Sequence, residues 1–111
     1  MSRNRWHMLR DDDSVTLARR VPVRFDLVVR TKLPAARKDR IAHQIRQDLW
    51  RALRGLRGFA PAVQVTDTQD GLTIAAGGEV SGRFPQAEAE SRLRAVLEDA
   101  ANRARWVRCA T

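Results

Sequence analysis

A chain of 111 residues has room for one domain of average size with a single hydrophobic core. Its hydrophobic content of 43% and its charged content of 31% are typical of a packed protein with a solvated surface, and they argue against a disordered chain. The formal net charge of +8 favours anionic partners without identifying one. The sequence has no apolar run of the ~20 residues that a membrane span needs, no evident secretory signal and only one cysteine. We therefore expect a cytoplasmic protein with no membrane partner.

Residues 1–15 show no periodicity, and their arginines are balanced by the acidic run Asp11-Asp12-Asp13. We predict a flexible N-terminal tail here, followed by a single α+β domain at 16–111. Trp6 argues mildly against complete disorder of the tail, because a large apolar ring can dock on the domain.

The first strand is predicted where the sequence begins to alternate. Apolar side chains occupy every second position from Val21 to Val29, which indicates a half-buried strand. Pro22 lacks a backbone N–H, so the beginning of this strand must lie at an edge or outside the ladder. Pro34 ends the strand and can open a helix.

The strongest pattern is a helix, which we place at about 35–56. Its apolar side chains recur at three- and four-residue steps and form one stripe, made of Ile41, Ile45, Leu49, Ala52, Leu53 and Leu56. Gly55 and Gly58 supply the stop. The opposite face is polar and contains Arg40, His43, Gln47, Arg51 and Arg54, with Trp50 at its flank near Arg46 and Arg57.

A hairpin is predicted next, with strands at about 62–68 and 72–80 around the turn Gln69-Asp70-Gly71. Gly77-Gly78 suggests a bulge or a bend in its second strand. A second helix follows Pro85 and runs to about Ala101 or Arg105. The last stretch, 106–110, is either a frayed helix end or a fourth strand.

The predicted order is therefore β-α-β-β-α, which indicates a small, mostly antiparallel sheet with two helices packed on one face. A right-handed crossover between the first two strands leaves room between them for the third. With a fourth C-terminal strand the arrangement would be ferredoxin-like.

The positive charge is unevenly distributed along the chain. Residues 16–61 carry a net charge of +9, whereas 62–84 is slightly acidic and the second helix is nearly balanced. The first helix, which Arg19 and Arg20 could join, therefore presents a basic face whose arginine forks match the paired oxygens of phosphates or carboxylates. The contact residues that we predict are Arg37, Lys38, Arg40, Arg51 and Arg54, flanked by Arg57 and Trp50.

We expect a small basic binding module, not an enzyme, that contacts a nucleic acid or an acidic protein surface through this face. The same face could also be solvated and bind nothing, and Trp50 could cover the edge of the core instead of stacking on a base. The alternative function is a protein–protein adaptor or homo-oligomerisation domain that uses a sheet edge or the open sheet face. The sequence leaves the oligomeric state open.

Motifs of catalysis, metal binding or nucleotide binding do not stand out. The GxxG spacing of Gly55 and Gly58 matches a KH loop, but a strand follows it where KH domains have a helix, which favours a helix end. The predicted open sheet face lacks the aromatic side chains of an RNA-recognition motif. His7, His43 and Cys109 do not have metal-ligand spacing, so we expect neither a metal nor a cofactor.

Overall fold

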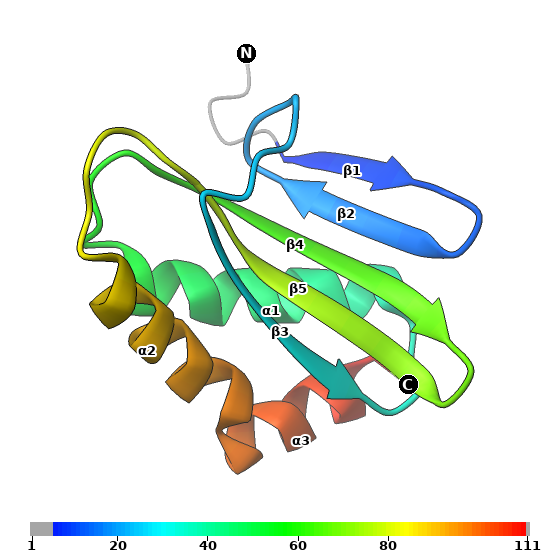
Figure 1. Ribbon diagram of the computed structural model, residues 1–111. Helices are drawn as coiled ribbons and strands as arrows, with labels where there is room; N and C mark the ends of the chain where they lie inside the picture. Colours follow the sequence, from blue (N-terminus) through cyan, green and yellow to red (C-terminus); the bar gives the residue numbers. More distant parts are fainter. Residues whose placement is uncertain (1–5, 111) are drawn as a thin grey trace.

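The computed structural model describes residues 6–110, which form a five-stranded sheet and three helices (Figure 1). The predicted α+β class is confirmed. In chain order the elements are β1 (His7–Arg10), β2 (Ser14–Ala18), β3 (Leu27–Leu33), α1 (Lys38–Leu53), β4 (Phe59–Thr68), β5 (Gly71–Val80), α2 (Gln86–Glu98) and α3 (Ala100–Cys109).

The strands lie in the order β1-β2-β4-β5-β3, and all neighbouring strands are antiparallel. β5 therefore lies between β3 and β4, in the gap that the predicted crossover leaves open. α1 connects β3 to β4 below the sheet (Figure 1). β1 and β3 are the two edge strands.

The first hairpin corrects the predicted start of the domain. β1 pairs with β2 from His7↔Ala18 to Arg10↔Val15, and the acidic run 11–13 forms the turn between them. β2 in turn pairs with β4, so it covers an edge of the ten-residue β4 that would otherwise be open. Residues 7–15 therefore belong to the domain. Residues 1–5 of the expected tail lie outside the described residues. Strands of four and five residues are too short for their alternation to stand out in the sequence.

β3 begins six residues later than the alternation suggests. The ladder with β5 starts at Leu27, and Pro22, which lacks a backbone donor, lies in the preceding segment outside the sheet. Asp26 extends the pairing by one step, since its backbone N–H donates to Gly78 O at 2.9 Å and its carboxylate accepts from Val80 N–H at 2.9 Å. The Val80 bond, helped by Arg24, lowers the pKa of Asp26.

α1 confirms the predicted helix over a slightly shorter range, and its apolar stripe faces the sheet. Ile41, Ile45, Leu49 and Leu53 are almost fully buried. One polar residue, Asp48, is buried beside them. The stripe fixes the orientation of α1, so the residues on the opposite side of the helix must face solvent.

The predicted β4–β5 hairpin is confirmed, with Gln69 and Asp70 at its turn. Gly77 and Gly78 form no bulge, because the pairing with β3 and β4 continues through both residues. Glycine is needed here because the neighbouring strands come close to β5. A Cβ on Gly77 would lie 1.8 Å from Leu27 O, and one on Gly78 would lie 2.2 Å from Ala60 O.

The end of the chain is helical. α2 ends at Glu98, and Asp99 opens α3 as its N-cap by accepting a hydrogen bond from Asn102 N–H at 2.8 Å. Residues 106–109 belong to α3, so the structure has no strand there and the ferredoxin-like order is not confirmed. Arg103 of α3 donates to Thr31 Oγ1 and to Lys32 O, which covers part of the β3 edge.

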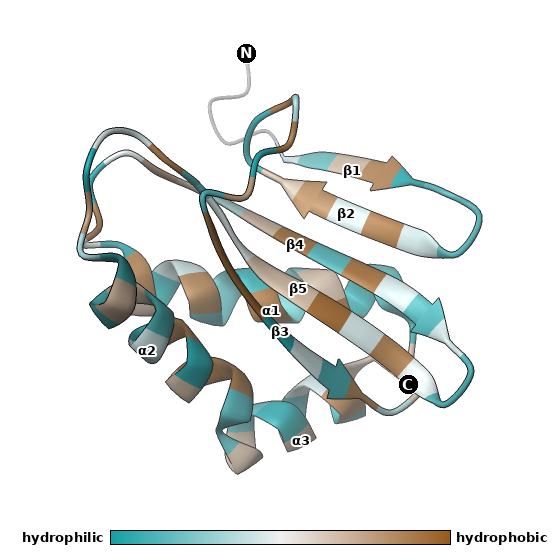
Figure 2. Cartoon of the chain, viewed as in Figure 1, coloured by the Kyte–Doolittle hydropathy of each residue, from teal (hydrophilic) through white to brown (hydrophobic). Residues whose placement is uncertain are grey.

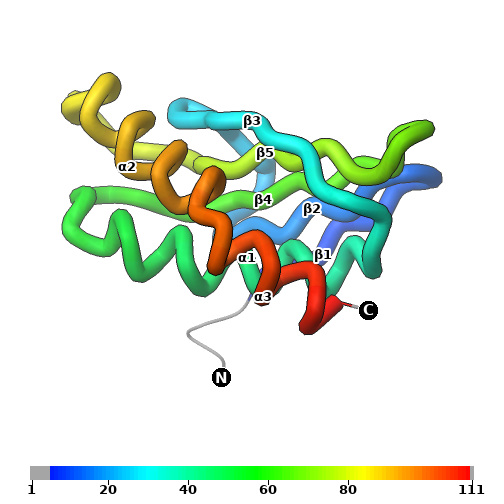
Figure 3. Tube along the Cα trace, turned by 90° about the horizontal axis from the view of Figure 1, so that it is seen from below, coloured from blue at the N-terminus to red at the C-terminus, as the bar shows by residue number. Residues whose placement is uncertain are grey.

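All three helices lie on one face of the sheet (Figures 1 and 3). Apolar and polar residues alternate along β4 (Figure 2), so one side of this strand contributes to the core. The core cluster joins that side to α1, α2 and α3, with Trp106 as its largest fully buried side chain. Within 6–110 no helix has the length and apolar content that a membrane span requires.

Candidate functional site

The exposed side of α1 carries the core of the predicted site. Arg40, Trp50, Arg51 and Arg54 are all exposed there, together with His43. Arg54, the C-cap residue of α1, lies 14 positions after Arg40, which is about 21 Å along the helix axis. Because the opposite side is locked against the sheet, these side chains share one rigid face.

Two of the predicted contact residues have acidic partners within the domain. Lys38 Nζ lies 2.6 Å from Asp67 Oδ2, and the Lys38 side chain is only 24% exposed. Arg51 Nη1 lies 3.8 Å from Asp48 Oδ1, although its side chain remains 71% exposed. Acidic side chains of the same domain partly neutralise these two cations, so they attract an anionic ligand less strongly than Arg40 and Arg54 do.

The remaining two arginines lie beyond the ends of the helix. Arg37 precedes α1 as its N-cap residue, and its backbone N–H donates to Ala110 O at 3.0 Å. Arg57 follows the C-terminal end and lines a cavity of about 320 Å³ together with Arg83 and Glu88. The basic residues therefore extend along the whole length of α1 without gathering at one point.

A second feature adjoins the exposed face, on the flank of α1 that faces the β1–β2 hairpin. We call it the Trp–Arg groove: a hollow of about 330 Å³ lined by Trp6, Arg19, Arg46 and Trp50. Trp6 comes directly before β1 and Arg19 directly after β2. The β1–β2 pairing therefore brings Trp6 and Arg19 together, and α1 adds the other two side chains.

Both arginines of the groove contact the Trp6 ring. Arg46 Cζ lies 4.7 Å from the ring centroid and Arg19 Cζ lies 5.8 Å from it, which is within the range of cation–π attraction. Arg46 Nε is buried and has no hydrogen-bond partner among residues 6–110. Trp50 remains 46% exposed, one of the most exposed large apolar side chains of the described residues.

The groove is lined by two arginines, and burial and charge there shift the pKa values of Arg46 and of the nearby His43. Burial lowers the pKa of Arg46. Burial also lowers the pKa of His43, the positive charge of Arg46 lowers it further, and Asp39 partly opposes both effects. No acidic side chain of the described residues lines the groove. It is therefore suited to an anionic or π-electron-rich ligand.

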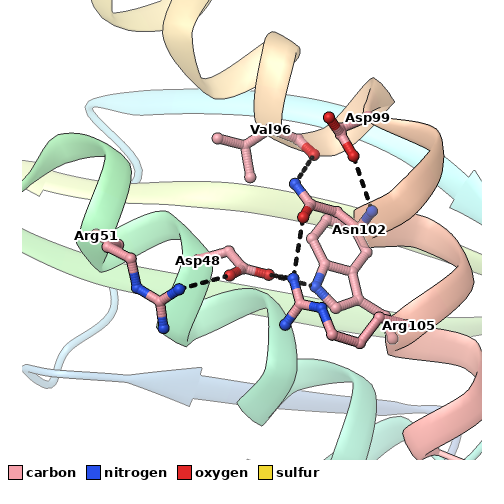
Figure 4. Close-up of polar contacts among 7 residues, drawn as sticks. Asp48, Arg51, Val96, Asp99, Asn102 and Arg105 are labelled. Atoms are coloured by element: carbon pink, nitrogen blue, oxygen red, sulfur yellow. Dashed lines mark hydrogen bonds and ion pairs between the residues drawn. The ribbon is translucent and has the colours of Figure 1, made fainter.

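The opposite flank of α1 holds a closed polar cluster, drawn in Figure 4. Asp48 Oδ2 accepts a hydrogen bond from Trp106 Nε1 at 2.6 Å and one from Arg105 Nη2 at 2.5 Å. Asp48 is 7% exposed and Trp106 is fully buried. This cluster fastens α3 to α1.

Three residues of the Trp–Arg groove were missing from the predicted contact set. The sequence suggested separately that Trp6 could dock, that Arg19 could join the basic face and that Arg46 neighbours Trp50. The sequence did not predict that these residues meet in one groove, because the β1–β2 hairpin that brings them together was not predicted.

Metal-ligating side chains do not gather in the described part of the chain, where no group of three His, Cys, Asp or Glu residues could hold an ion. His43 lies on the exposed face of α1, and Cys109 is exposed at the end of α3. Neither residue lines the Trp–Arg groove or the cavity beside Arg57.

The chain matches no protein-family model, no curated protein and no solved structure.

Proposed function

We propose that this chain is a non-enzymatic binding module that holds a nucleic acid on the exposed face of α1. The observation that carries the proposal is an exposed tryptophan, Trp50, in a row of exposed arginines on one rigid helix. Arginine forks fit phosphate oxygens, and an indole ring offers a surface on which a base can stack.

A nucleic acid fits these features better than an acidic protein surface does. Carboxylates on a protein would satisfy Arg40 and Arg54 equally well, but they would give no role to the neighbouring indole. The residues with the strongest claim to phosphate contact are Arg40, Arg46, Arg54 and Arg57, since Lys38 and Arg51 have acidic partners within the domain. Contacts of this kind position a backbone and give little sequence specificity.

The test is a titration with fluorescently labelled DNA over about 50 to 200 mM salt. If roughly four arginines each neutralise a phosphate, the slope of log K against log salt is about −3 for a single strand. The variant Arg40→Glu/Arg54→Glu should bind weakly and lose about 1.4 of that slope. A flat salt response, or no binding at low salt, would remove nucleic acid as the partner.

The matched control is Arg30→Glu/Arg94→Glu, which changes the net charge by the same amount. Arg30 is exposed on β3 and Arg94 is exposed on α2, so neither belongs to α1. If the control weakens binding as much as the variant on α1, net charge and not the α1 face holds the ligand. Circular dichroism melts of both variants show whether the fold is preserved.

Self-association is a second function that one observation favours. Leu9 and Val21 are 44% and 47% exposed. With Val23 and Phe25 they line an apolar groove of about 680 Å³ on the sheet face away from the helices. Exposed apolar patches of this kind often mark protein contacts. A dimer in light scattering that Leu9→Ser dissociates would support this function.

A further inference from the structure

We infer that the Trp–Arg groove receives an unpaired nucleobase, so that the ligand of this domain is a single strand. This inference rests on the proposed function and names the form of nucleic acid that α1 holds. Its basis is the difference between the two indole rings of the groove.

Trp6 is already engaged by the protein. The guanidinium of Arg46 lies 4.7 Å from the Trp6 ring centroid, and Arg19 approaches it at 5.8 Å. Its ring thus acts as a platform that orders two flexible cations along the wall of the groove. Trp6 is a positioning residue and not the stacking surface.

Trp50 is the ring that a ligand can use. It lines the same groove, it is 46% exposed, and the described residues give it no hydrogen bond or cation–π partner. Its place on α1 is fixed because Leu49 and Leu53 anchor that turn of the helix in the core. A rigid, half-exposed indole at a positive groove is the arrangement that stacks bases in single-strand binding proteins.

The polar groups of the groove complement this stacking. Arg46 Nε is buried, and the described part of the chain gives it no hydrogen-bond partner, a cost that an acceptor on a ligand would relieve. Base edges carry carbonyl and ring-nitrogen acceptors, and the backbone carries phosphate oxygens. The guanidinium of Arg46 can donate to either kind of acceptor.

Duplex DNA cannot use the groove in this way. Its bases are stacked on one another, and extruding one costs a few kcal/mol. A duplex would contact only the arginines of α1, through its phosphates. A single strand gains both contacts, with the backbone along the row from Arg40 to Arg54 and a base on Trp50.

The experiment compares a labelled oligothymidine of about 15 nucleotides with a duplex of the same length. The wild-type chain should bind the single strand more tightly than the duplex. Trp50→Ala should weaken single-strand binding by about 5- to 150-fold, the effect of losing one stacked base, and should change duplex binding by less than about twofold. Trp50→Phe, which keeps an aromatic ring, should restore most of the affinity.

Three results would overturn the inference: equal or tighter binding of the duplex, an unchanged single-strand affinity in Trp50→Ala, or an equal loss for both nucleic acids in that variant. If Arg40→Glu/Arg54→Glu still weakens binding in those cases, the proposed function survives and the groove does not hold a base. If the wild type binds neither form at low salt, both proposals fail. Since Trp50 is half-exposed, Trp50→Ala should retain the wild-type melting temperature.

Discussion

Tryptophan and arginine side chains lie against both flanks of α1, and the two flanks behave differently. On the α3 side, Trp106 and Arg105 both donate to Asp48, and the indole is fully buried. On the hairpin side, Arg46 contacts the ring of Trp6, and Trp50 remains 46% exposed. The same residue types therefore form a closed cluster on one flank and an open groove on the other.

The difference is a buried carboxylate. Asp48 supplies an acceptor for the indole N–H and a counter-charge for the guanidinium, so the α3 flank is satisfied within the protein. The groove has no acidic lining residue within 6–110, and Arg46 Nε lacks an acceptor. An arginine beside a tryptophan is thus a structural contact where the protein provides the anion, and under the proposed function it is a ligand contact where the protein does not.

The largest expected effect sharpens this contrast by deleting one indole from each flank. Trp106→Ala should lower the free energy of unfolding by about 3–5 kcal/mol, because it opens a cavity in the core. Trp50→Ala should change it by no more than about 0.5 kcal/mol, since the ring is half-exposed. Urea unfolding followed by far-UV circular dichroism measures both. Equal losses would mean that Trp50 belongs to the core and that the open groove does not exist.

A smaller effect comes from removing the carboxylate. Asp48→Ala should cost about 1–3 kcal/mol in the same unfolding assay, because the buried Trp106 Nε1–H loses its acceptor. The control is the Trp106→Phe background, which has no indole N–H. Asp48→Ala should cost less there, and a cost that is unchanged by the background would show that Asp48 acts through Arg105 or Arg51 instead.

Long elements were predictable from the sequence because their patterns repeat. The stripe from Ile41 to Leu53 predicted α1 and its buried side, and an Asp-Gly pair predicted the β4–β5 turn. β1 and β2 were missed because they contain four and five residues, and β1 includes a histidine and an arginine. Their stability comes from pairing with β4, which is a tertiary effect that no local pattern records.

The candidate site was predictable only as far as it lies on one helix. Helical periodicity places Arg40, Trp50 and Arg54 on the exposed side of α1. It also placed Lys38 and Arg51 in the contact set, since the carboxylates that partly neutralise them are distant in the sequence or buried. The groove depends on Trp6, 40 positions before Arg46, and such contacts follow from the fold and not from spacing.

The smallest expected effect uses His43 to report on the open flank. Burial and the positive charge of Arg46 hold the pKa of His43 below its usual 6.5, while Asp39 opposes them. Because the lowered pKa applies to the folded state, the unfolded chain binds the proton more readily. The contribution of His43 to stability is therefore lost as the pH falls through 6.5 toward the folded-state pKa.

Titration of the imidazole resonances by NMR measures this pKa, and Arg46→Gln should raise it, since the loss of the nearby positive charge favours the imidazolium. A bound nucleic acid should raise it further in the wild type, because phosphates favour the imidazolium as well. A His43 pKa that does not respond to a saturating single strand would place the ligand away from this side of α1.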